Sequence, residues 1–128
     1  MSDFKTLLSI KKFISPHFTK AKATDCITTG AKKMSKEKVD CILVYKGKAL
    51  EGIVTESDII RKVIAAEHSP KKMFLKTIMT PQIIYIESDE SLFEAKKIME
   101  KSGVRHLVVK EEEEVIGTIS ASDLMGNL

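Results

Sequence analysis

Two seven-residue segments decide the fold of this chain: GIVTESD at residues 52–58 and GTISASD at residues 117–123. They begin 65 residues apart, and the same shift lays residues 10–60 on residues 75–125 without a gap. Ten of these 51 positions are identical, and others keep their character, as Ile42 and Leu107 do. A fixed internal period indicates a duplicated structural unit. The sequence therefore predicts two copies of one small fold.

Each copy is expected to fold as βαββα. In the second copy, Ser91 and Glu94 have the spacing of a helix capping box, and Gly103 is placed to end the helix that follows. Apolar runs of strand length surround this helix, at residues 83–86, 104–109 and 115–119. A last helix begins after residues 120–123 and must be short, because few residues follow it.

The first copy shows the same order, with a helix around Ile27, Ala31 and Met34. Its strands are predicted at residues 18–21, 41–45 and 50–54, and its closing helix at residues 58–66. Phe4, Leu7 and Leu8 suggest a short N-terminal helix that packs beside the pair. We therefore expect this helix and the first copy in residues 1–66, a polar linker in residues 67–74 and the second copy in residues 75–128.

Composition limits the class of protein. With 128 residues and 43% apolar content, the chain suffices for one compact unit or two very small ones. Charged residues make up 30% of it but leave a net charge of only +3, which excludes a disordered polyelectrolyte and a strongly cationic nucleic-acid arm. Because Cys26 and Cys41 form no close pair and no long apolar segment occurs, we expect a cytoplasmic protein without membrane insertion.

The repeat resembles a tandem pair of cystathionine beta-synthase (CBS) domains, a Bateman module. Both heptapeptides match that family's pattern of glycine, an apolar residue, any residue, Ser or Thr, two further residues and aspartate. Thr118 departs from it mildly, since the family prefers an apolar residue there. The resemblance covers residues 10–125 and implies an α+β fold, in which two βαββα repeats with small mixed sheets and flanking helices pack as a pseudo-twofold pair. Nothing is left over for a catalytic domain, so we expect no enzyme activity and no required cofactor.

The resemblance also implies clefts between the copies that bind adenosine-containing ligands, such as AMP, ADP, ATP or S-adenosylmethionine. The carboxylates of Asp58 and Asp123 have the acceptor oxygens that suit the two hydroxyls of a ribose. The hydroxyls of Thr55 and Ser120 lie at predicted helix starts, where a phosphate is stabilised. The same spacing is also that of a capping box, which needs no ligand, and both roles can coexist.

Further ligand contacts are predicted around these motifs. Arg105 and His106 enter a strand where nucleotide-binding CBS pairs carry basic residues, so we interpret them as phosphate contacts of the pocket around Asp123. The backbone around Phe18 and Thr19 is expected to wall the base in that pocket, and Ile83 and Ile84 are expected to wall the pocket around Asp58.

The two predicted pockets differ in charge. The 65-residue shift aligns Arg105 with Asp40 and His106 with Cys41. A guanidinium attracts a phosphate through charge-assisted hydrogen bonds, whereas a carboxylate repels it. We therefore expect the Asp123 pocket to take the phosphorylated ligand. The Asp58 pocket should bind more weakly, prefer a less anionic ligand such as S-adenosylmethionine, or stay empty.

Other classes of function have little support. The chain has no nucleophile motif and no phosphate-binding loop, and its histidines and cysteines have no metal-ligand spacing. The basic run at residues 32–38 contains no aromatic residue, so a nucleic-acid partner is not expected. The function favoured is a regulatory sensor of AMP, ADP or ATP. The alternatives are a sensor of S-adenosylmethionine and a ligand-free scaffold for dimerisation.

A homodimer is the predicted assembly, because a CBS pair resembles half of a disc of four repeats. Residues 1–64 carry 13 lysines and arginines against 7 acidic residues, whereas residues 65–128 carry 8 against 11. A head-to-tail disc would set each basic copy against the acidic copy of its partner. Charge therefore favours that direction.

Overall fold

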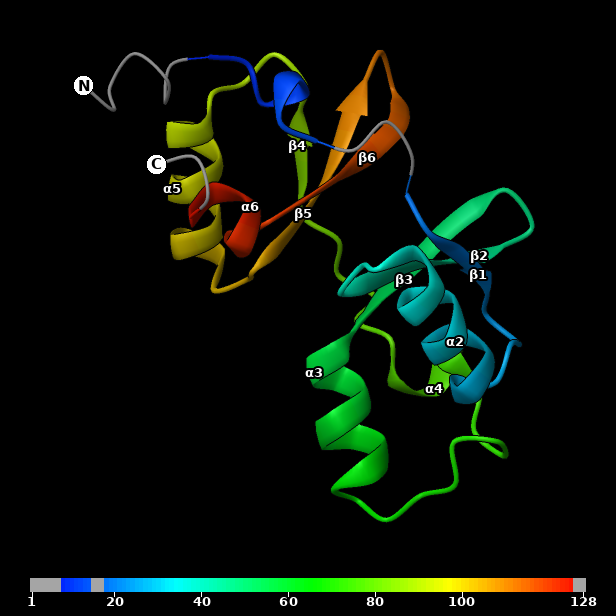
Figure 1. Cartoon of the computed structure of the whole chain (residues 1–128). Helices are drawn as coiled ribbons and strands as arrows, with labels where there is room; N and C mark the ends of the chain where they lie inside the picture. The colour runs from blue at the N-terminus through cyan, green and yellow to red at the C-terminus, as the bar shows by residue number, and fades with distance from the viewer. Residues whose placement is uncertain (1–7, 15–17, 126–128) are drawn as a thin grey trace. The chain divides into compact units, whose positions relative to one another are not determined.

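The computed structural model of the chain describes residues 8–14 and 18–125, which form two compact units (Figure 1). The first unit comprises residues 19–83, and the second combines residues 84–128 with residues 1–18. Each unit contains one three-stranded mixed sheet and helices, so the predicted α+β fold with two βαββα repeats is confirmed. The N-terminal helix predicted from Phe4, Leu7 and Leu8 falls largely outside the described residues.

In the first unit, β2 lies between β1, which runs parallel to it, and the antiparallel β3. Ile27, Met34 and Leu75 belong to the buried core that forms around this sheet. The elements in chain order are β1 (Lys20–Lys22), α2 (Ile27–Glu37), β2 (Cys41–Lys46), β3 (Ala49–Thr55), α3 (Glu56–Ile59), the π-helical turn Ile60–Ile64 and α4 (Leu75–Ile78).

The second unit repeats this plan, with β5 between the parallel β4 and the antiparallel β6. Even the irregularity recurs, because the register shifts between Val44 and Tyr45 and again between Val109 and Lys110. The elements are the 3-10 helix Ile10–Lys12, β4 (Tyr85–Glu87), α5 (Leu92–Ser102), β5 (His106–Glu111), β6 (Glu114–Ser120) and α6 (Ala121–Met125).

The ends of the long helices follow the predicted signals. The hydroxyl of Ser91 accepts a hydrogen bond from the backbone N–H of Glu94 (3.1 Å) and so caps α5. Gly103 ends this helix in the left-handed conformation, with φ at 67°. Lys38, its counterpart in the first repeat, adopts the same conformation with φ at 58°. The repeat therefore preserves the backbone turn even where glycine is absent.

The compact units and the sequence repeat divide the chain differently. Ile10 is fully buried in the core of the second unit, and its N–H donates to the carbonyl of Glu90 (2.8 Å). Its repeat counterpart Leu75 is fully buried in the core of the first unit, and its N–H donates to the carbonyl of Asp25 (2.9 Å). The segment that precedes the first strand of each repeat thus completes the core of the other repeat.

This exchange places residues 75–83 in the same unit as the first repeat, although the sequence boundaries group them with the second. Strand starts differ from the prediction as well. The ladders with β2 and β5 begin only at Lys20 and Tyr85, so β1 and β4 start two residues later than the apolar pattern suggested. No helix in the described part of the chain combines the length and the apolar character that crossing a membrane requires.

Candidate functional site

The first heptapeptide forms the junction between β3 and α3. Thr55 caps α3: its Oγ1 accepts a hydrogen bond from the backbone N–H of Asp58 (3.1 Å). In return, Oδ2 of Asp58 accepts one from the backbone N–H of Thr55 (2.9 Å). These reciprocal bonds are a capping box, so the structural role considered for this motif is present.

The second heptapeptide builds the same arrangement between β6 and α6. Oγ of Ser120 accepts a hydrogen bond from the backbone N–H of Asp123 (3.2 Å), and Oδ2 of Asp123 accepts one from the backbone N–H of Ser120 (2.8 Å). The hydroxyls of Ser120 and Ser122 also lie 2.8 Å apart. Because a carboxylate has two oxygens with two lone pairs each, capping and accepting hydrogen bonds from a ligand are chemically compatible.

The strand that enters each sheet brings further predicted residues to these junctions. In the second unit, His106 pairs with Ser120 across β5 and β6, and the carbonyl of Arg105 accepts a hydrogen bond from the N–H of Ala121 (2.8 Å). Arg105, His106, Ser120 and Asp123 therefore gather at one end of one sheet, as the sequence predicted.

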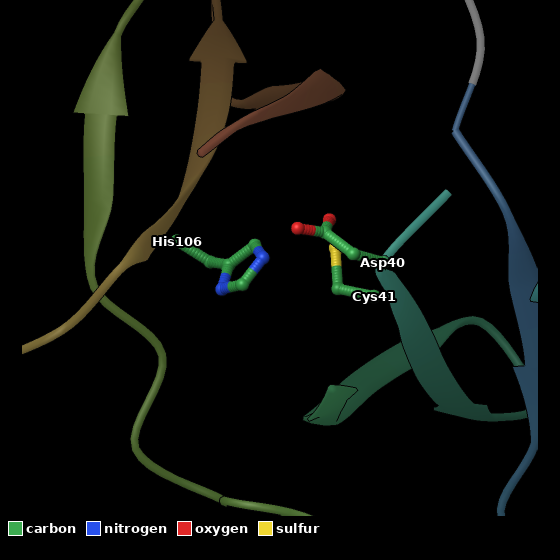
Figure 2. A group of neighbouring side chains, drawn as sticks. All are labelled: Asp40, Cys41 and His106. Atoms are coloured by element: carbon green, nitrogen blue, oxygen red, sulfur yellow. The ribbon is translucent and has the colours of Figure 1, made fainter. Parts of the chain in front are cut away.

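The first unit has the equivalent contacts with different residues. Cys41 pairs with Thr55 across β2 and β3, and the carbonyl of Asp40 accepts a hydrogen bond from the N–H of Glu56 (3.0 Å). Figure 2 shows Asp40 and Cys41 as neighbours where β2 begins, and His106 where β5 begins. Asp40 thus adjoins the first capping junction through its backbone, at the position that Arg105 takes beside the second.

The two capping aspartates differ in their surroundings. Asp58 is only 6% exposed, and its Oδ1 lies 3.1 Å from Nζ of Lys62, which also donates to the carbonyl of Ile78 (3.0 Å). Asp123 is exposed. Sequence analysis missed the role of Lys62, although its place four residues after Asp58 on the closing helix could have indicated an ion pair.

Gly52, the first residue of the first heptapeptide, makes room for a neighbouring side chain. A Cβ at this position would lie 2.6 Å from Sδ of Met79 and 2.7 Å from its Cγ, closer than carbon atoms approach without displacement. The side chain that approaches this glycine closely is that of Met79, which packs against the core of the first unit. Packing alone thus accounts for this glycine.

The residues predicted to wall the two pockets lie just before the first strand of each sheet. The backbone carbonyls of Thr19 and Ile84 accept hydrogen bonds from β2 and β5 of their own units (2.9 and 3.0 Å). Phe18 and Ile83 directly precede them and are half-buried. The buried hydroxyl of Thr19 has no hydrogen-bond partner among the described residues, which fits a polar contact with a ligand. Contact of these four residues with a ligand stays a prediction.

Two βαββα units that each carry a capped strand-to-helix junction define a class of paired repeat modules. The family model of the CBS domain matches this chain twice, at residues 11–65 and 75–128. The chain belongs to the CBS-domain family, and the resemblance proposed from the two heptapeptides is confirmed.

Curated relatives carry the same domain. The chain is 29% identical over 106 residues to the mitochondrial CBS domain-containing protein CBSX3 of Arabidopsis thaliana. The matched region covers 79% of this chain and 52% of that protein. It is 36% identical over 89 residues to the CBS domain-containing protein CBSCBSPB2 of the same plant. This matched region covers 69% of this chain but only 17% of that protein. The chain thus spans about half or less of these relatives.

Solved structures share the fold. A protein with CBS domains from Burkholderia ambifaria superposes with a TM-score of 0.80 at 33% identity, covering 86% of this chain and 81% of the other. A hexameric CBS-CP12 protein from bloom-forming cyanobacteria reaches a TM-score of 0.86 at 23% identity, covering 93% of this chain and 71% of the other. The latter likeness concerns the fold alone.

Proposed function

We propose that this chain is a regulatory module that binds an adenine nucleotide, AMP, ADP or ATP, at the junction of β6 and α6. Tandem CBS domains are in general regulatory ligand-binding modules. The observation that carries the choice of ligand is the gathering of Arg105, Ser120 and Asp123 at one end of the second sheet. A guanidinium, a hydroxyl and a carboxylate are the groups that a phosphate and a ribose require.

The difference between the units supports this choice of site. Asp123 is exposed, whereas Asp58 is buried and already holds the ammonium of Lys62. A ribose that approached Asp58 would have to compete with this ion pair, and the strand beside this junction carries Asp40 where the second unit carries Arg105. The second unit is therefore the better nucleotide site, in line with the charge difference predicted from the sequence.

Isothermal titration calorimetry with AMP tests the proposal on the whole chain. Asp123→Ala removes the ribose acceptor, and lost charged hydrogen bonds at roughly 1.5–3 kcal/mol each should weaken AMP binding by at least about 10-fold. Asp58→Ala is the matched control and should change the dissociation constant by less than about 3-fold. Arg105→Asp gives the second repeat the negative charge that Asp40 provides in the first. It should weaken the binding of AMP far more than the binding of adenosine, which has no phosphate. Loss of AMP binding in Asp58→Ala with full binding in Asp123→Ala would reverse the assignment.

The competing function is a scaffold without a ligand. A ligand at 100 times its dissociation constant stabilises a folded protein by about 2.7 kcal/mol, which a thermal-shift measurement detects. A shift with AMP, ADP or ATP supports the nucleotide sensor, and one with S-adenosylmethionine alone would identify a sensor of that compound. No shift with any of the four would favour the scaffold. Regulation by the nucleotide would then follow from its difference in affinity between two states of the pair.

A second copy of the chain is the partner that we propose for the closing helices. Ile60 and Ile64 of the first repeat are 60% and 56% exposed, and Met125, the repeat counterpart of Ile60, is 76% exposed. Ile60 and Ile64 lie about one turn apart on the same helix, and exposed apolar side chains grouped in this way mark interaction sites. The basic first copy and the acidic second copy favour a head-to-tail homodimer.

We further propose the cytoplasm as the compartment. Cys26 and Cys41 form no disulfide bond in the structure, which is compatible with a reducing environment.

A further inference from the structure

The first unit carries a hollow that is lined by four lysines. It has a volume of about 410 Å³ and lies among β1, α2, β2 and the turn that follows β2. Ala21, Tyr45 and Gly47 complete its lining, and none of its lining residues is acidic. None of them was predicted to contact the adenine nucleotide. We call this feature the four-lysine hollow; its lysines are Lys20, Lys22, Lys33 and Lys48.

Backbone and ring contacts fix part of this basic lining. Lys20 and Lys22 are exposed on either side of the buried Ala21, so both project from the same side of β1. Nζ of Lys33 donates a hydrogen bond to the carbonyl of Lys20 (3.0 Å), which holds this ammonium at the edge of the sheet. Nζ of Lys20 lies 5.3 Å from the ring centroid of Tyr45, within the range of a cation–π contact.

The second repeat shows that the fold does not require this charge. In the second repeat, Glu87 stands at the position of Lys22 and Glu113 at the position of Lys48. The second repeat also has a cation–π contact at these positions, with the lysine and the tyrosine interchanged: Nζ of Lys110 lies 3.9 Å from the ring centroid of Tyr85. Gathering like charges is unfavourable, and the same β-sheet forms with acids at two of these positions. A ligand of opposite charge would give Lys22 and Lys48 a role that the fold does not require.

We propose that the four-lysine hollow binds a small anion with several phosphate groups, at a site separate from the adenine nucleotide. Its volume lies in the range of small-molecule sites, roughly 300–1,000 Å³. An acidic peptide that added a strand to β1 fits less well, because three outward backbone groups of this edge strand already have hydrogen-bond partners. The ammonium of Lys33 donates a hydrogen bond to the carbonyl of Lys20, and the carboxylate of Asp25 accepts one from the N–H of Lys22 (3.0 Å).

Calorimetric titration of inorganic tripolyphosphate into the whole chain tests the site, because this probe carries neither a ribose nor a base. At about 0.05 M salt, where screening is weak, we expect one bound tripolyphosphate. The double variant Lys22→Gln with Lys48→Gln should weaken it by at least about 10-fold. The double variant Lys71→Gln with Lys72→Gln makes the same change in net charge at exposed residues of the first unit outside the hollow, and should stay within about 2-fold.

Equal weakening by the two double variants, or no binding by the wild type, would overturn the proposal. Asp123→Ala should leave tripolyphosphate binding intact, so failure of this site and failure of the nucleotide site give different results. ATP that binds the hollow more tightly than tripolyphosphate would identify a nucleoside-linked ligand, and equal affinity would identify a free polyphosphate. An oligonucleotide that displaces tripolyphosphate and depends on the same two lysines would instead assign the hollow to nucleic acid.

Discussion

Replacing Asp58 by alanine should harm the stability of the protein more than the same change at Asp123. Asp58 is buried and serves two partners, the backbone N–H of Thr55 at 2.9 Å and the ammonium of Lys62 at 3.1 Å. Asp123 makes the equivalent cap bond but is exposed. Solvent can therefore replace the lost carboxylate at the second junction more readily than at the first.

The magnitudes follow from these contacts. Loss of a helix cap costs about 0.5–2 kcal/mol, and a buried, charged cap bond belongs at the upper end of that range. The side chain of Lys62 is 44% exposed, so solvent screening limits its ion pair with Asp58 to at most about 1 kcal/mol. We expect Asp58→Ala to lower the free energy of unfolding by about 2–3 kcal/mol and Asp123→Ala by about 1 kcal/mol.

Urea unfolding followed by circular dichroism measures both values. Lys62→Met is the matched control, since it removes the ion pair and leaves the capping box. In a double-mutant cycle, Asp58→Ala and Lys62→Met should show a coupling energy of up to about 1 kcal/mol, whereas Asp123→Ala and Lys62→Met should be additive. A larger loss in Asp123→Ala than in Asp58→Ala would refute the assignment of Asp58 to a mainly structural role.

Two further predictions concern acid stability and assembly. The ammonium of Lys11 (2.7 Å) and the hydroxyl of Ser88 (2.9 Å) bind the carboxylate of Glu111 and lower its pKa below the usual 4.5. The stability that Glu111 provides is thus present above its unfolded pKa and is lost as the pH falls through its folded pKa. Between about pH 6 and about pH 3, the free energy of unfolding measured in urea should therefore fall less in Glu111→Gln than in the wild type. Ile60→Glu places a charge on the exposed apolar face of the closing helix and should convert the proposed homodimer to monomer in sedimentation velocity. An unchanged dimer would show that this helix face is not the interface.

The periodic part of the structure could be predicted from the sequence because it rests on local signals. Ser91 and Gly103 bound α5 through cap geometry that three or four neighbouring residues determine. The 65-residue shift then transfers each observation to the other copy, so that a weak signal in one repeat is supported by its counterpart. Arg105 lies close to Ser120 as predicted, because a short hairpin joins the two strands that carry them. The register shift between Val109 and Lys110, which sets the pairing of His106 with Ser120, could not be predicted in this way.

The exchange of Ile10 and Leu75 could not be predicted, because an apolar residue before a strand does not indicate which of two equivalent cores it enters. The same holds for the four-lysine hollow. Its lysines belong to three separate segments, and the basic run at residues 32–38 contributes only Lys33 to the lining. A cluster of this kind exists only after the parallel pairing of β1 with β2 has brought Lys22 beside Tyr45.

The duplication separates what the fold needs from what function can vary. Both capping boxes are retained, because each connects a strand to a helix and its loss would leave backbone N–H groups without acceptors. Around these fixed boxes the charges have diverged, with Asp40 where the other repeat has Arg105. Folding is satisfied by either residue, since in both repeats the contact with the helix start is made by the backbone carbonyl. The contact with the helix start therefore does not determine the charge at this position, and we propose that this charge selects the ligand. The symmetry of the repeats reflects what the fold requires, and their asymmetry is where we expect function to differ.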